Sequence, residues 1–237
     1  MKVAIRGDDP NLAILELATH ALGDLCDSLV FVGGCAAGLL VTAVQAQPIR
    51  ATQDVDVVVQ VATIGEYHAM EKDLAGRGFN NDTSPDAPIC RWLHGNLKLD
   101  LMPSEGAILG FNNRWYPLAI QTAERVELPS GGAIRLIFPP VFIATKLEAF
   151  RDRGNGDYLA SHDLEDILSV VDGRVELIAE ARRSGEELRS YLSTEIRALL
   201  GITDFLDALP GHLPGDSASQ QRAPELLRRL RQLSEIA

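Results

Sequence analysis

Arg50-Ala51-Thr52-Gln53-Asp54-Val55-Asp56-Val57-Val58-Val59 predicts a buried β-strand that begins with two carboxylates. A run of valines favours a strand that is covered on both faces. Because side chains alternate between the faces of a strand, Asp54 and Asp56 point the same way. Two such charges repel each other unless a positive charge lies between them, and Mg2+ prefers carboxylate oxygens together with substrate phosphates. The pair therefore predicts a magnesium site; the alternative is two solvated acids at an exposed strand edge.

A glycine pair precedes this strand. Leu29–Val32 is predicted as a short buried strand, Gly33-Gly34 ends it, and Cys35–Val44 is predicted as a helix of small residues. Glycines between a strand and a helix let backbone N–H groups approach a phosphate. The alternative is a plain tight turn. The pair is neither a P-loop nor a dinucleotide-binding fingerprint, because the further residues of those motifs are missing.

A third carboxylate follows on a later strand. Ile89–Leu93 and Leu97–Met102 predict a hairpin around His94-Gly95-Asn96. In its second strand Asp100 lies on the face opposite three leucines, where it is either a solvated acid or a partner of the first two aspartates. Three such carboxylates would form a metal cage for phosphoryl chemistry, in which the metal activates the attacking oxygen and neutralises the leaving pyrophosphate.

The remaining pattern predicts an α+β fold, with a mixed β-sheet flanked by helices and followed by a C-terminal helical bundle. Asn11 and Thr63 are predicted helix caps. We expect an α/β domain over 1–138 and a helical domain over 139–237. The sequence also predicts a second hairpin (Ala123–Leu128 and Ala133–Phe138), a linker (Pro210–Ala223) and helices at Val141–Arg151, His162–Val171, Val175–Arg183, Glu186–Leu200 and Pro224–Ile236.

Two charged features mark the helical half. Lys146 falls inside the apolar stripe of its helix, where it either extends to solvent or holds an anion such as a triphosphate. Asp163 and Asp166 are neighbours one turn apart on the next helix, near its N-terminus. Their alternative role is stabilisation of the helix dipole.

Composition excludes several classes of protein. The 46% hydrophobic and 23% charged content is that of an ordinary soluble globular protein, and the apolar runs are too short for a membrane span. The three cysteines show no metal-ligand spacing, so we expect reduced thiols and a cytoplasmic location. A net charge of −11 argues against a general nucleic-acid binder.

The order strand, Gly33-Gly34, helix and Asp54-Val55-Asp56 resembles the DNA polymerase β-like nucleotidyltransferase superfamily, which has a third aspartate on a later strand. The long gap between the glycines and the aspartates is similar to the AbiEii/MenT-like branch of nucleotidyltransferase toxins. That branch also carries a Lys-x-x-Ala-x-x-x-Arg helix and an Asp-x-x-Asp helix. Residues 146–153 and Asp163-Leu164-Glu165-Asp166 match these two patterns.

The resemblance implies a Mg2+-dependent enzyme in which the helical domain completes the active-site cleft. The metal would be held by Asp54, Asp56 and Asp100, which would also be catalytic, with Asp163 or Asp166 supporting catalysis.

The resemblance also implies a set of nucleotide-binding residues, namely Gly33, Gly34, Arg50, Thr52 and Lys146. An NTP would be the substrate, its NMP would pass to a hydroxyl of a tRNA or a protein, and a cognate antitoxin would be a partner. Two alternatives stay open. A cationic small molecule of the aminoglycoside type would be attracted to an acidic cleft. A non-catalytic nucleotide-binding or interaction module would use the same residues without transfer.

Overall fold

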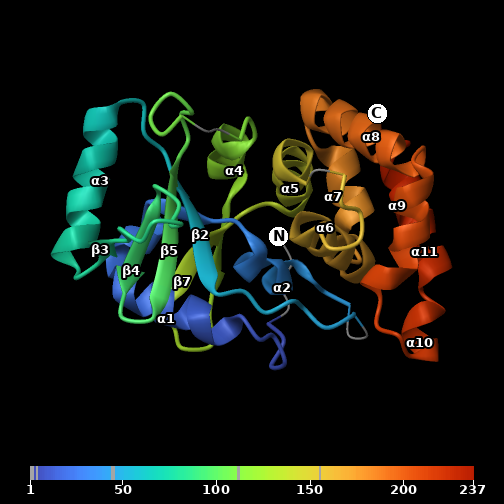
Figure 1. The fold of residues 1–237 in the computed structure, drawn as a ribbon, viewed down its shortest axis with the longest axis horizontal. Helices are drawn as coiled ribbons and strands as arrows, with labels where there is room; N and C mark the ends of the chain where they lie inside the picture. The colour runs from blue at the N-terminus through green and yellow to red at the C-terminus, as the bar shows by residue number, and fades with distance from the viewer. Residues whose placement is uncertain (1–2, 4, 44–45, 111–112, 155) are drawn as a thin grey trace. The chain divides into compact units, whose positions relative to one another are not determined.

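The computed structural model describes residues 3, 5–43, 46–110, 113–154 and 156–237, which form two compact units (Figure 1). The first unit consists mainly of Ile5–Ala36 and Ala51–Phe138. The second consists mainly of Ala37–Arg50 and Pro139–Ala237, so a segment from the N-terminal half belongs with the C-terminal helices. None of the described helices is both long enough and apolar enough to cross a membrane.

The first unit is built on a mixed seven-stranded sheet in the order β3-β4-β5-β2-β1-β7-β6. Strand β2 pairs in parallel with β5 and antiparallel with β1, and β1 pairs in parallel with β7. The strands are β1 (Leu29–Phe31), β2 (Asp54–Val59), β3 (Asn80–Asn81), β4 (Arg91–His94), β5 (Leu97–Pro103), β6 (Glu124–Glu127) and β7 (Ala133–Leu136). The predicted α+β class, with a mixed sheet flanked by helices and a helical C-terminal part, is confirmed.

Short helices flank this sheet. They are α1 (Leu12–Leu22), η1 (Gly23–Asp27), η2 (Gly34–Ala36), α3 (Ile64–Gly76) and α4 (Tyr116–Thr122), and α1 packs against β2 and β5. The predicted cap of α3 is confirmed as a capping box: the Thr63 hydroxyl accepts from the Glu66 N–H, and the Glu66 carboxylate accepts from the Thr63 N–H. The predicted burial of β2 is also confirmed, because Val55, Val57 and Val58 are fully buried.

The predicted cap at Asn11 is wrong. The helix begins after Asn11, but the Asn11 side chain makes no capping hydrogen bond. Its Oδ1 instead accepts from the N–H of Thr52 at 2.8 Å, so the amide holds the segment that leads into β2. Sequence periodicity shows where the helix starts, but not that a distant backbone group competes for the capping oxygen.

The prediction of a helix over Cys35–Val44 is wrong over most of its length. Only η2 and the four-residue α2 (Ala37–Leu40) form, and Val44 lies outside the described residues. The N–H groups of Thr42 and Ala43 both donate to the carbonyl of Gly173, at 3.0 and 2.8 Å, instead of continuing a helical ladder. A tertiary hydrogen bond to a carbonyl more than a hundred residues away thus ends the helix.

The second unit is helical. Its helices after α2 are α5 (Pro139–Arg153), α6 (His162–Gly173), α7 (Leu177–Arg183), α8 (Glu186–Leu200), α9 (Thr203–Ala208), η3 (Leu209–His212), α10 (Ser217–Gln220) and α11 (Ala223–Leu233). Helix α5 packs against α6, α7 and α8, and α11 packs against the same three. The fully buried Arg174 pairs with Glu180 at 2.6 Å and donates to the carbonyl of Leu40, which joins α2 to this bundle.

The five long helices predicted for this half begin and end within three residues of the prediction. The predicted linker Pro210–Ala223 is wrong as an irregular segment, because η3 ends and α10 lies within it. The Asp216 side chain caps α10 by accepting from the N–H of Ser219 at 3.0 Å. A helix this short has no apolar periodicity to indicate it, and the short α4 and α9 escaped prediction for the same reason.

Candidate functional site

Three aspartates lie close together on two neighbouring parallel strands of the first unit. On β2 and β5, Asp56 is paired in register with Asp100, and Asp54 with Lys98. Register partners share a face of the sheet, and so do residues two apart on one strand. Asp54, Asp56 and Asp100 therefore present their carboxylates to one face; we call these three residues the carboxylate row.

An arginine that the sequence reasoning missed completes this row. Arg91 is the register partner of Asp100 on the antiparallel strand β4. Its Nε donates to Asp100 Oδ1 at 2.8 Å and its Nη2 donates to Asp100 Oδ2 at 2.7 Å. The same Nη2 donates to Asp54 Oδ2 at 2.8 Å. The positive charge that the aspartate pair requires is supplied, in this structure, by a guanidinium.

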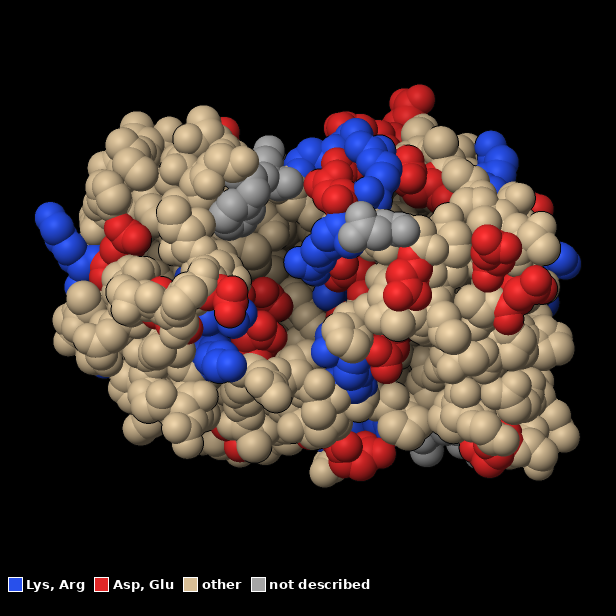
Figure 2. Space-filling model, viewed as in Figure 1, with Lys and Arg blue, Asp and Glu red and all other residues tan. Residues whose placement is uncertain are grey.

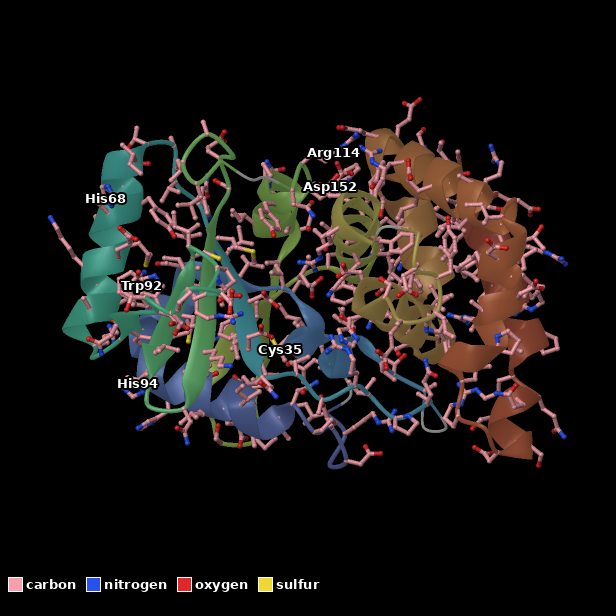
Figure 3. All side chains as sticks on the ribbon, viewed as in Figure 1. Cys35, His68, Trp92, His94, Arg114 and Asp152 are labelled. Atoms are coloured by element: carbon pink, nitrogen blue, oxygen red, sulfur yellow. The ribbon has the colours of Figure 1, made fainter. Side chains whose placement is uncertain are left out.

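The sequence predicted this hairpin but not its register. A three-residue turn at His94-Gly95-Asn96 would pair Leu93 with Leu97 and Cys90 with Asp100, because the register of an antiparallel hairpin follows from its turn. The observed turn is one residue shorter, since His94 belongs to β4 and pairs with Leu97, and Arg91 is therefore opposite Asp100. Trp92 and His94 alternate to the other face of β4 (Figure 3). On the face shown in Figure 2, acidic and basic side chains adjoin one another over β4, β5 and β2.

These charges act on the neighbouring titratable groups. The hydrogen bond to Asp100, followed by the charges of Asp100 and Asp54, raises the pKa of Arg91, so this guanidinium stays charged. Burial, with the charges of Asp100 and Asp56, raises the pKa of the Cys90 thiol to about 12. Cys90 is therefore a neutral thiol at physiological pH and not a nucleophile.

Gly33 leaves the space that the Asp56 carboxylate occupies. Its φ is +33°, and a Cβ built on it would lie 1.7 Å from Asp56 Oδ2 and 2.4 Å from Asp56 Cγ. The backbone is joined at the same point, because the N–H of Val32 donates to the Asp56 carbonyl at 3.0 Å. Gly34 follows as the buried first residue of η2. Glycine is required at position 33 both by the backbone conformation and by the carboxylate beside it.

Thr52 orients the chain as it enters β2. Its hydroxyl donates to the Asp54 carbonyl at 3.2 Å, and its N–H donates to the Asn11 side chain. These contacts tie the Asp54 backbone to Thr52, and tie Thr52 to the residue that precedes helix α1.

The carboxylate row offers oxygen ligands of the kind that Mg2+ prefers. Asp54 and Asp56 are half-buried on one face and fit this chemistry, since Mg2+ is usually held by one or two carboxylates plus substrate phosphates. Asp100 fits it less well, because both of its oxygens accept hydrogen bonds from Arg91. Within the described part of the chain, no group of three or more His, Cys, Asp or Glu side chains is arranged to hold a metal ion.

A second cluster of charges lies in the second unit, between α5 and α6. The Lys146 side chain is only 10% exposed, and its Nζ lies 2.7 Å from Asp166 Oδ2 and 3.1 Å from Asp163 Oδ1. Arg153 forms a fork on Asp163, at 2.8 and 2.9 Å. Arg50 lies 3.3 Å from Asp166. The alternative in which Lys146 extends to solvent is wrong, because the amine is buried between two carboxylates.

These cations decide the charge of the buried acids. Burial by itself raises the pKa of Asp163, but the hydrogen bond from Arg153 and the charges of Lys146 and Arg153 outweigh it. The pKa of Asp163 therefore lies below its ordinary value, and the carboxylate is ionised at neutral pH. Asp163 also lies in the first turn of α6, where Ser161 provides the cap.

The predicted site residues divide between the two units. The first contains Gly33, Gly34, Thr52, Asp54, Asp56 and Asp100, and the second contains Arg50, Lys146, Asp163 and Asp166. Each group is compact within its own unit.

No protein-family model matches this chain, and no curated protein matches it. The chain is similar to two solved structures. One is JHP933 from Helicobacter pylori, at 14% identity and a TM-score of 0.48, covering 98% of this chain and 93% of that one. The other is described as a candidate nucleotidyltransferase from H. pylori, at 14% identity and a TM-score of 0.46, covering 98% and 95%. Similarity of this extent identifies neither a family nor a reaction, so the functional proposal depends on the carboxylate row itself.

Proposed function

We propose that this chain is a Mg2+-dependent nucleotidyltransferase that moves an NMP from an NTP to an acceptor hydroxyl. The observation that carries the proposal is the carboxylate row: three aspartates on one face of a buried parallel strand pair, with Gly33 making room for one of them. Acids at such positions are costly to a fold, since Asp is depleted in strands and like charges repel. A catalytic role for the carboxylates explains why a strand would carry them.

In the proposed reaction the acceptor oxygen attacks the α-phosphorus of the NTP. The acceptor hydroxyl loses its proton to water, a new P–O bond forms between its oxygen and the α-phosphorus, the bond between the α-phosphorus and the bridging oxygen breaks, and pyrophosphate leaves with the electron pair. Asp54 and Asp56 would hold Mg2+, and Asp100 would act as the third acid of the row. The bound metal would neutralise charge on the phosphates and lower the pKa of the acceptor hydroxyl. The backbone of Gly33 and Gly34 would contact the nucleotide phosphates.

For the second unit we propose that Lys146 and Arg50 bind phosphate. Each is held by aspartates, so a triphosphate would compete with those carboxylates for the cations. Asp163 and Asp166 would then keep the lysine amine charged and positioned when no nucleotide is bound. The role of this unit in completing an active-site cleft stays a prediction.

The acceptor we favour is a tRNA or a protein, in a toxin-like enzyme with a cognate antitoxin and a cytoplasmic location. This part of the proposal depends on the residue pattern Lys146–Arg153 and Asp163–Asp166, and the cytoplasmic location on the burial of the three cysteines. A second candidate is a cationic small molecule of the aminoglycoside type, which the net charge of −11 favours.

Labelled NTPs distinguish these candidates. The full chain is incubated with each α-32P NTP, Mg2+ and, in parallel, total tRNA, a protein extract and an aminoglycoside. Label on tRNA or protein supports the toxin-like enzyme, and label on the antibiotic supports the small-molecule enzyme. Nucleotide binding without transfer to any acceptor, unchanged by Asp56→Ala, would instead indicate a non-catalytic module.

A further inference from the structure

The contacts of Arg91 within the carboxylate row are unequal. With Asp100 it forms a bidentate pair, and that carboxylate is 9% exposed. With Asp54 it shares a single nitrogen, and that carboxylate is 36% exposed. Bidentate arginine–carboxylate pairs are strong and geometrically specific, and water competes more easily for an exposed single contact.

The strand register makes the first of these pairs permanent. Arg91 and Asp100 are opposite each other on β4 and β5, joined by the short turn at Gly95, so their backbones cannot separate without opening the hairpin. Asp54 lies on β2, two strands away from β4, and reaches Arg91 only through its side chain. A change of partner therefore costs least at Asp54.

We propose that Arg91 is the resident counter-ion of the carboxylate row: it stays paired with Asp100, holds Asp54 while no metal is bound, and gives Asp54 up to Mg2+. This inference depends on the proposed function, since it assumes a metal held by Asp54 and Asp56. It assigns a positioning role to Arg91 and makes Asp100 its anchor instead of a metal ligand. A guanidinium is charged at every physiological pH, which suits this role.

Two consequences follow from electrostatics. Arg91 keeps the carboxylates from repelling one another in the metal-free protein, so the row is assembled before Mg2+ arrives. The same positive charge, within hydrogen-bonding distance of a metal ligand, opposes the metal, so Arg91 lowers Mg2+ affinity. An excess of Mg2+ alone would then bind weakly, and the phosphates of the nucleotide would supply the remaining attraction.

The test measures Mg2+ binding to the full chain by calorimetry, without nucleotide, for the wild type and Arg91→Gln. Loss of a unit charge beside the ligands should tighten Mg2+ binding by about tenfold or more. Arg125→Gln is the matched control, because Arg125 is on the same sheet and pairs with a single aspartate, Asp27, at 3.2 Å. Its Mg2+ affinity should equal that of the wild type. Thermal melting gives a second readout: Arg91→Gln should melt lower than wild type without Mg2+ and gain more from added Mg2+.

The double variant Arg91→Gln/Asp100→Asn keeps the test decisive if Arg91→Gln does not fold, because it removes both members of the buried pair together. It should bind Mg2+ at least as tightly as the wild type. Loss of Mg2+ binding in this variant would show that Asp100 is a metal ligand and would overturn the proposal. A Mg2+ affinity that is unchanged or weaker in a folded Arg91→Gln would overturn it as well. If neither the wild type nor any variant binds Mg2+, either alone or together with a non-hydrolysable NTP analogue, the proposed metal-dependent function itself fails. Binding in the wild type that Arg91→Gln leaves unaltered overturns only the role of Arg91.

Discussion

Replacement of Gly33 by alanine should disturb the carboxylate row while the rest of the fold stays intact. The new Cβ would lie 1.7 Å from Asp56 Oδ2 and 2.6 Å from Asp56 Cβ. Ordinary contacts between such atoms are about 3.5–4.0 Å, so the carboxylate oxygen must move by about 2 Å. Misplacement of a catalytic group by about 1 Å costs about a hundredfold in rate, and we expect nucleotidyl transfer by Gly33→Ala to fall at least that far.

The stability cost of Gly33→Ala has two sources. An alanine at a φ of +33° costs about 1–2 kcal/mol, and displacement of Asp56, whose Cβ lies 2.6 Å from the new Cβ, adds the ~1–3 kcal/mol typical of overpacking. For a protein of this size each kcal/mol shifts Tm by about 2–4 °C, which predicts a fall of about 4–20 °C in thermal melting. The variant should therefore be folded at 25 °C while its transfer from an α-32P NTP and its Mg2+ affinity are lost.

Gly131→Ala is the matched control for this prediction. Gly131 has a φ of +87° in the turn between β6 and β7, and among the residues that the structure describes, its two chain neighbours aside, no atom lies within 4 Å of the Cβ that would be added. It carries the same kind of backbone cost without touching a carboxylate. Transfer and Mg2+ binding by Gly131→Ala should be those of the wild type. If Gly33→Ala and Gly131→Ala have equal transfer activity, the position of Asp56 does not matter and our reasoning is refuted.

Two further predictions concern the second unit. Lys146→Met should lower the free energy of unfolding, but by less than the ~3–5 kcal/mol typical of a broken buried ion pair, because Arg153 still neutralises Asp163. It should also weaken NTP binding. Equal NTP affinity in Lys146→Met and in the exposed control Lys72→Met would contradict the proposed phosphate role. Because the pKa of Asp163 is lower in the folded state than its ordinary value of 3.8, its contribution to stability is present above that pH and is lost as the pH falls through the folded pKa. Urea unfolding measured at several pH values should therefore show a smaller loss of stability below pH 3.8 for Asp163→Asn than for the wild type, and identical slopes would contradict the assignment.

The sheet of the first unit could be predicted well from local pattern. Val57-Val58-Val59 and the glycine turn after Leu93 carry strong signals of a buried strand and a hairpin, and both form. The register of the hairpin was wrong by one residue, because His94 was assigned to the turn whereas it belongs to β4, and this difference places Arg91 opposite Asp100. Sequence reasoning assigned the missing positive charge to a metal because it considered the aspartates without their neighbours across the strands.

The failures have a common cause, which is competition from distant groups. Thr42 and Ala43 donate to the Gly173 carbonyl, and the Asn11 side-chain oxygen accepts from Thr52. These hydrogen bonds to residues remote in the sequence replace the helical and capping hydrogen bonds that the local sequence favours. Lys146 was recognised as anomalous on its helix, but only the packing of α5 against α6 could show that aspartates one turn apart hold it. Long-range pairing of this kind has no local sequence signature.

The central claim is nucleotidyl transfer at the carboxylate row, and one measurement tests it most directly. Wild type and Asp56→Asn are incubated with Mg2+, a mixed tRNA and protein extract, and an NTP labelled either at the α- or at the γ-phosphate. We predict that the wild type transfers only the α-label to a macromolecule and releases pyrophosphate, and that Asp56→Asn, with unchanged thermal melting, transfers neither. Transfer of the γ-label, or equal α-transfer by wild type and Asp56→Asn, would contradict the account.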